Sequence, residues 1–125
     1  MAKILIIEDD PMMSRMYQNA LALKGHETES AKDGEEGLLK TGSYHPDLIL
    51  LDVMMPKMNG MEVLDKLKSG QETQSIPVVM LTNLSGEKDA ETAISKGAKR
   101  YLIKSDYEPQ QVVDIINEEL STQTR

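Results

Sequence analysis

Apolar positions along the chain fall into four short runs, and a fifth segment of similar length alternates polar residues with few apolar ones. Residues 4–7 and 48–51 are each four consecutive aliphatic residues, which is typical of strands buried on both faces of a parallel sheet. Residues 26–31 are mostly polar, which predicts a strand at a sheet edge. Residues 76–82 and 101–103 complete the set, so the pattern predicts five strands.

Helix signals follow the first two strands. Asp10 precedes Pro11, and these residue types favour the cap and the first position of a helix, which Gly25 then ends. Asp33, with Glu36 three residues later, resembles a capping box and predicts a second, shorter helix. Each of these helices connects one predicted strand to the next.

The later helices show the same signals. Residues 59–60 mark a loop before a third helix, residues 85–86 start a fourth that stops at Gly97, and Pro109 opens a fifth. We expect residues 121–125 to be a frayed tail. Alternation of strands with helices calls for right-handed crossovers, so we predict an α/β fold whose parallel sheet is covered on both faces.

Composition narrows the class of protein. With 125 residues and no linker, the chain is predicted to be a single domain, residues 1–125, with no output domain. A net charge of −7 with scattered lysines argues against nucleic acid as a partner. The first apolar run is too short for a signal peptide or a membrane span, so we expect a cytoplasmic protein, and the lack of cysteine excludes thiolate chemistry.

Acidic residues follow two of the strands directly. Glu8 and Asp9 come after the first strand and Asp52 after the third, and the carboxyl ends of parallel strands form the binding edge of an open α/β sheet. Carboxylates gathered there repel one another unless a proton or a cation offsets their charge. Mg²⁺ fits best, because it takes one or two carboxylates and completes its octahedron with water and phosphate oxygens.

The same edge should collect Thr82 and Lys104 from the fourth and fifth strands. Asp52 could then act as a metal ligand and as a nucleophile that attacks phosphorus to form an acyl phosphate. Lys104 would bind a phosphoryl oxygen as a compact cation. Thr82 could donate a hydrogen bond to another phosphoryl oxygen and so sense whether the group is present.

Motifs carrying these residues resemble the receiver domains of two-component response regulators over nearly the whole chain. The matching segments are Ile6-Ile7-Glu8-Asp9-Asp10, Asp52-Val53-Met54-Met55-Pro56 with Asn59-Gly60, Leu81-Thr82, and Tyr101-Leu102-Ile103-Lys104. The resemblance implies a flavodoxin-like, five-stranded parallel sheet in the order 2-1-3-4-5, doubly wound by five helices. It also implies a phosphoprotein whose Asp52 accepts a phosphoryl group from a histidine kinase or a histidine phosphotransfer protein.

The resemblance implies that the metal is Mg²⁺, with Mn²⁺ as an alternative. The ligands that the resemblance implies are Glu8, Asp9, Asp52 and the backbone carbonyl of Met54. On phosphorylation Thr82 would move toward the phosphoryl group and Tyr101 would change rotamer. The face formed by the fourth helix, fifth strand and fifth helix would then bind an unidentified downstream partner, with the protein a monomer or a weak dimer through that face.

Three positions depart from the family pattern. Ser105 stands where proline usually follows the lysine, and a cis bond before a non-proline residue costs roughly 3 kcal/mol, so we expect a trans or a strained loop after Lys104. Met54 and Leu84 occupy positions that commonly set dephosphorylation rates, and neither side chain can orient an attacking water. These residues predict a long-lived aspartyl phosphate.

Two other functions compete with a phosphorylation-controlled interaction module. A metal-dependent phosphohydrolase would place a second acid two residues after its nucleophile, where this chain has Met54, so we expect no turnover of an external substrate. A scaffold that has abandoned phosphorylation would not need the complete set of acids, threonine and lysine. His26 and His45 lie outside the predicted edge and are interpreted as surface residues.

Overall fold

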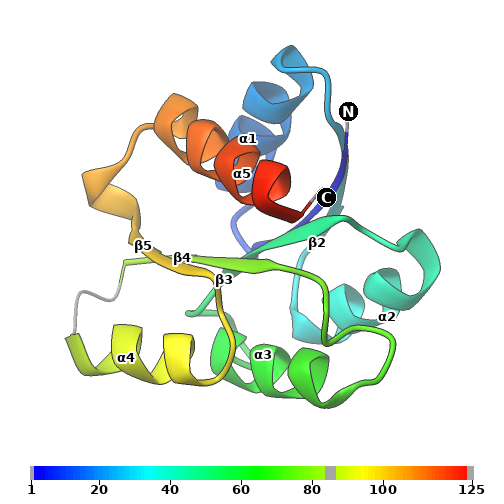
Figure 1. Cartoon of the computed structure of the whole chain (residues 1–125). Coiled ribbons are helices and arrows are strands. Elements are labelled where there is room, and N and C mark those ends of the chain that lie inside the picture. The colour runs from blue at the N-terminus through cyan, green and yellow to red at the C-terminus, as the bar shows by residue number, and fades with distance from the viewer. Residues whose placement is uncertain (1, 84–86, 124–125) are drawn as a thin grey trace.

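One sheet lies between two layers of helices in the computed structural model, which describes residues 2–83 and 87–123 (Figure 1). Helices α1 and α5 cover one face, and α2, α3 and α4 cover the other. The elements are β1 Lys3–Ile7, α1 Pro11–Leu23, β2 Glu27–Ala31, α2 Gly34–Tyr44, β3 Leu48–Asp52, α3 Gly60–Ser69, β4 Val78–Thr82, α4 Glu87–Ser95, β5 Arg100–Ile103, the 3₁₀ turn η1 Lys104–Asp106, and α5 Pro109–Gln123.

All pairings in the sheet are parallel, and the strand order is β2-β1-β3-β4-β5. This confirms the predicted fold class, doubly wound and flavodoxin-like. The register aligns Ile7 with Leu51 and Asp52 with Leu81, so the carboxyl ends of β1, β3 and β4 finish at nearly the same level. That alignment positions the functional site.

Side chains of the central strands alternate between two cores. Ile4 and Ile6 of β1 pack with α1 and α5, whereas Leu5 and Ile7 pack with the core beneath α2, α3 and α4. All four are at most 1% exposed, because side chains point to opposite faces of a strand and both faces here are covered. The continuous aliphatic runs in the sequence follow from this double burial.

Helix starts agree with the predicted cap residues, although the capping box at Asp33 is incomplete because Glu36 accepts the amide of Lys32 and not that of Asp33. The Asp10 carboxylate accepts a hydrogen bond from the Met12 amide at 2.9 Å, and Asp33 accepts one from the Glu36 amide at 2.9 Å. The predicted start of the fourth helix, residues 85–86, lies outside the described residues. These caps fix the points at which the chain leaves the sheet edge and enters each helix.

The predicted tail is wrong for residues 121–123, because α5 continues to Gln123. The Ser121 and Thr122 hydroxyls donate hydrogen bonds to the carbonyls of Glu118 and Glu119. Such bonds return to the preceding helical turn and satisfy polar side chains within the helix, which is why polar composition alone did not predict the boundary correctly.

His26 is half-buried, so its interpretation as a surface residue is wrong. Its Nδ1 accepts the Ala2 amide at 3.2 Å, and its Nε2 lies 2.6 Å from Asn117 Oδ1 on α5. Both contacts are satisfied by the neutral ring with its proton on Nε2. His26 therefore joins the start of β1 to the last helix, at the edge of the sheet opposite the acids. His45 is exposed, as expected.

Candidate functional site

The side chains that the sequence predicts for the site lie at the carboxyl ends of the strands, along one edge of the sheet. Glu8 follows Ile7 of β1, and Asp52 is the last residue of the adjacent β3. Thr82 ends β4, and its register partner on β5 is Ile103, the residue before Lys104. Residues far apart in sequence thus lie at one rim, as we expect of parallel strands.

Three carboxylates form the centre of this rim. Glu8, Asp9 and Asp52 each offer an oxygen, and the three atoms lie within 4.8 Å of one another. Glu8 and Asp52 are 5% and 6% exposed, whereas Asp9 is exposed to solvent. Oxygen donors converging in this way, with one side open to water, suit a hard divalent cation that keeps part of its hydration shell.

Lys104 lies against the buried carboxylates. Its Nζ is 2.9 Å from Glu8 Oε1 and 3.7 Å from Asp52 Oδ2. Burial opposes the charged amine, but the hydrogen bond to Glu8 and the two negative charges together raise the pKa of Lys104. The peptide bond to Ser105 is trans and opens the turn η1, so the trans alternative is correct and the lysine still reaches the site.

Asp52 has a strongly perturbed acidity. Burial, followed by the nearby charge of Glu8, raises the pKa of Asp52 to about 7, against the opposing effects of Lys104 and of the Met54 amide, which lies 3.2 Å from Asp52 Oδ1. One lysine is thus not enough to offset two buried carboxylates. The donor set fits a cation, because a bound positive charge would relieve this repulsion.

Gly60 allows the β3–α3 loop to fold back beneath the acidic residue. A Cβ at this position would lie 2.3 Å from the carbonyl oxygen of Asp52 and 2.7 Å from the Cα of Val53. The Gly60 amide also donates to the Val53 carbonyl at 2.8 Å. The sequence marked residues 59–60 only as a loop, and no local signal distinguishes a turn glycine from one required by such a close approach.

Tyr17 is a second residue whose place near the site was not predicted. It lies on α1, is 2% exposed and belongs to the core beneath α1 and α5. Burial raises the pKa of its phenol; Lys104 opposes this shift, and the charges of Glu8 and Asp52 add to it. The phenol therefore lies within the electric field of the site, whereas helical periodicity indicated only an apolar position.

Of the two predicted switch residues, Thr82 lies at the rim and Tyr101 lies just beneath it. Thr82 is fully buried at the end of β4, and Tyr101 is half-buried on β5, where its register partner is Met80. Met80 and Tyr101 pack in the core beneath α2, α3 and α4, and alternation along β4 places Thr82 on the same face as Met80. Leu84 lies outside the described residues.

The fold and the site together define a class: doubly wound α/β domains that carry a carboxylate pocket at the carboxyl edge of the sheet. The pocket lies beside the point where β1 and β3 send their following helices to opposite faces, which is where such folds bind ligands.

Comparison with known proteins narrows this class to one family. The family model of the response regulator receiver domain matches residues 4–117. The DNA-binding dual master transcriptional regulator RpaA of Synechocystis sp. is 39% identical over 104 residues, which are 83% of this chain and 43% of RpaA. The alkaline phosphatase synthesis transcriptional regulatory protein PhoP of Bacillus subtilis is 37% identical over 110 residues, or 88% of this chain and 45% of PhoP. The chain spans less than half the length of these relatives.

Comparison with solved structures points to the same family. The chemotaxis protein CheY4 of Vibrio cholerae superimposes with a TM-score of 0.87 at 29% identity, covering 94% of this chain and 98% of CheY4. A receiver domain of a histidine kinase from Syntrophus aciditrophicus gives a TM-score of 0.89 at 30% identity, covering 100% and 94% of the two chains. The chain belongs to the response regulator receiver domain family of two-component signalling, and its acidic pocket can hold a divalent metal ion.

Receiver domains are signalling modules and do not turn over an external substrate, which agrees with the expected absence of such turnover. In the part of the chain that the structure describes, no helix combines the length and the apolar character needed to cross a bilayer.

Replacing Gly60 with alanine tests the close approach beneath Asp52. We expect Gly60→Ala to lower the free energy of unfolding by roughly 2 kcal/mol or more, because the added methyl group must displace backbone. Urea denaturation measures this change. In the matched control, Gly42→Ala, the methyl group meets nothing within 4 Å and should be neutral or slightly stabilising in α2. Equal stability of the two variants would contradict the packing argument.

The raised pKa of Asp52 makes stability depend on pH. Because the folded protein holds this proton up to about pH 7 and the unfolded chain releases it near pH 4, the free energy of unfolding falls as the pH rises from about 4 to about 7 and stays low above that range. We expect Asp52→Asn, without metal, to stabilise the protein at pH 8 by up to about 4 kcal/mol and to lose this advantage toward pH 4. Urea denaturation of both proteins at pH 8 and pH 4 measures this difference in the free energy of unfolding. A difference that does not vary with pH would refute the raised pKa of Asp52.

Proposed function

We propose that Asp52 is the phosphoacceptor of this receiver domain and that Mg²⁺, or Mn²⁺ in its place, is bound beside it. Support comes above all from the three carboxylate oxygens within 4.8 Å of one another, with the Lys104 amine 3.7 Å from Asp52. Glu8 and Asp9 would hold the cation together with Asp52 and the backbone carbonyl of Met54. When bound, the cation neutralises charge on the phosphoryl oxygens during transfer.

In the transfer step a carboxylate oxygen of Asp52 attacks phosphorus. The new oxygen–phosphorus bond forms as the bond from phosphorus to the donor breaks, and the donor leaves with the electron pair. Lys104, whose amine already lies beside Glu8 and Asp52, would turn to bind one of the phosphoryl oxygens as a cation. The donor is a histidine kinase or a histidine phosphotransfer protein, as is usual in two-component systems.

Phosphorylation would then act on Thr82 and Tyr101. Thr82 is buried one residue beyond the strand position paired with Asp52, so a hydroxyl that shifts toward a phosphoryl oxygen must repack its surroundings. Tyr101 lies on the same face of the sheet and contacts the core that includes Ala93 of α4. Repacking there would alter the face formed by α4, β5 and α5, through which a downstream partner binds or a weak dimer forms.

Other expectations for the chain stay predictions. RpaA is described as DNA-binding, but more than half of RpaA lies outside the match, so we propose no nucleic-acid contact for these 125 residues themselves. We also propose a cytoplasmic location and a single domain over residues 1–125. The only catalysis proposed is that of the domain's own phosphorylation and dephosphorylation.

A small acyl-phosphate donor tests the acceptor directly. We expect the wild-type protein, incubated with acetyl phosphate and Mg²⁺, to gain the mass of one phosphoryl group, which is detected by intact-mass spectrometry, whereas Asp52→Asn gains none. The matched control, Asp114→Asn, removes an exposed carboxylate on α5 and should be modified like the wild type. An unmodified wild type would favour the scaffold, and a modified Asp52→Asn variant would place the acceptor elsewhere.

The side chains near the acceptor predict a slow loss of the phosphoryl group. Met54 is 56% exposed at the mouth of the site, and its thioether is too weak an acceptor to orient water. We expect the wild-type phosphoprotein to keep its label roughly tenfold longer than a Met54→Asn, Leu84→Glu double variant, which supplies polar groups able to position water. The rate at which each purified phosphoprotein releases phosphate measures the two lifetimes. Equally rapid loss from the two proteins would exclude this role.

A further inference from the structure

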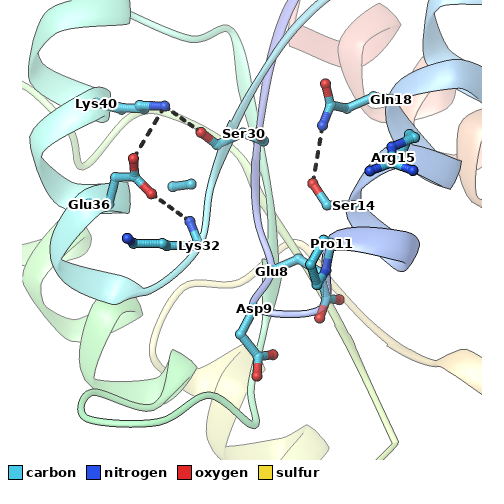
Figure 2. A pocket seen from close by; sticks show the side chains of 11 residues that line it. Glu8, Asp9, Pro11, Ser14, Arg15, Gln18, Ser30, Lys32, Glu36 and Lys40 are labelled. Atoms are coloured by element: carbon cyan, nitrogen blue, oxygen red, sulfur yellow. Dashed lines mark hydrogen bonds and ion pairs between the residues drawn. The ribbon is translucent and has the colours of Figure 1, made fainter.

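Two hollows adjoin the carboxylates of the site, and they differ in polarity. The first, of about 280 Å³, is bordered by Glu8, Asp9 and polar side chains of α1 and α2, several of which are paired with one another or with backbone, as the dashed lines in Figure 2 show. The second, of about 470 Å³, is formed by the chain just after Asp52, and its described lining residues are Val53, Met54, Met55 and Asn59. The β3–α3 loop therefore presents a mainly apolar surface beside the acceptor.

Met54 is the exposed member of this apolar lining. It is 56% exposed, whereas Val53 and Met55 are buried. Its amide nitrogen lies 3.2 Å from Asp52 Oδ1. Because an N–Cα bond adds only about 1.5 Å, the Met54 Cα lies within about 4.7 Å of the same oxygen. The methionine side chain is unbranched and flexible, so from this position its thioether can extend over a group bound to Asp52.

A thioether that solvent reaches is open to oxidation by peroxides. In this reaction a new sulfur–oxygen bond forms as the peroxide oxygen–oxygen bond breaks. The sulfur loses two electrons, and the remaining half of the peroxide takes the proton of the transferred oxygen and leaves as water or an alcohol. Met55 and Met80 are buried and therefore shielded, whereas Met54 is not. The product is a sulfoxide, whose polar oxygen accepts hydrogen bonds, whereas the thioether sulfur is only a weak acceptor.

We propose that Met54 is an oxidation site and that its sulfoxide shortens the lifetime of a phosphoryl group on Asp52. This role rests on the proposed function, since it requires Asp52 to be the acceptor. Oxidation places a hydrogen-bond acceptor on an otherwise apolar side chain within reach of the phosphoryl group. A peroxide would in this way end the phosphorylated state sooner, without any change in the phosphodonor.

The sulfoxide acts on the water that removes the phosphoryl group. That water attacks phosphorus, and its oxygen–phosphorus bond forms as the bond from phosphorus to the Asp52 oxygen breaks. Asp52 leaves as a carboxylate, one proton of the water stays on the released phosphate, and the other passes to solvent. A thioether cannot orient this water, but a sulfoxide oxygen accepts one of its hydrogen bonds and holds it. Because Met54 is exposed, this oxygen lies on the side from which water arrives.

Phosphate release before and after treatment with hydrogen peroxide tests this site. Peptide mapping locates the added oxygen, and the treatment stops while Met55 and Met80 are still unmodified. After the peroxide is removed, each sample is labelled with acetyl phosphate and Mg²⁺, and we expect the oxidised wild type to release phosphate at least threefold faster than the untreated protein. Met54→Leu should release phosphate at the same rate whether treated or not. The matched control Met12→Leu, which removes a 76% exposed methionine from α1, should respond as the wild type does.

Reduction of the sulfoxide provides a further control. Methionine sulfoxide reductases of both epimer specificities should restore slow release, since they return the sulfur to a thioether. Unchanged or slower release from protein oxidised at Met54 would overturn the oxidation site, as would a Met54 that stays reduced while Met12 is oxidised. An equal response of Met54→Leu and the wild type would assign the effect to another methionine and also overturn it. If the untreated wild type takes up no phosphoryl group, the proposed acceptor fails as well, whereas normal labelling with unaltered release refutes the oxidation site alone.

Discussion

Repulsion between two buried carboxylates is the constraint on which the site depends. Glu8 and Asp52 lie at the ends of adjacent strands, each about 5% exposed, and the amine of Lys104 contacts both. A single positive charge does not offset two negative charges out of water, so Asp52 keeps a raised pKa. The carboxylates of Glu8 and Asp52 therefore still repel each other, and a bound divalent cation would offset this repulsion.

Packing holds this unfavourable arrangement in place. The strands that carry the acids are buried on both faces, so their ends cannot separate without exposing aliphatic side chains such as Ile6 and Leu50. Gly60 lets the loop after β3 return close beneath Asp52. Stability of the whole sheet thus maintains this local geometry against the repulsion between its carboxylates.

Local patterns in the sequence were enough to predict the α/β fold class and the gathering of Glu8, Asp52 and Lys104 at one edge of the sheet. Four consecutive aliphatic residues lack the spacing of an amphipathic helix and are typical of a strand buried on both faces of a parallel sheet. Acids placed directly after two such strands lie at the same edge of that sheet. The resemblance to receiver domains supplied the strand order and the switch residues. These features depend on short-range periodicity and on the parallel topology, which the chain itself encodes.

Other features of the site and of its surroundings depend on tertiary contacts. The proximity of Tyr17 to the site, the tether from His26 to α5, and the close approach at Gly60 depend on segments that meet only after folding. The pKa of Asp52 likewise depends on how deeply two strand ends are buried and on where Lys104 comes to lie. A linear pattern shows which residues share a strand or a helix face, but burial and electric field are sums over neighbours in space, and only the packed structure determines them.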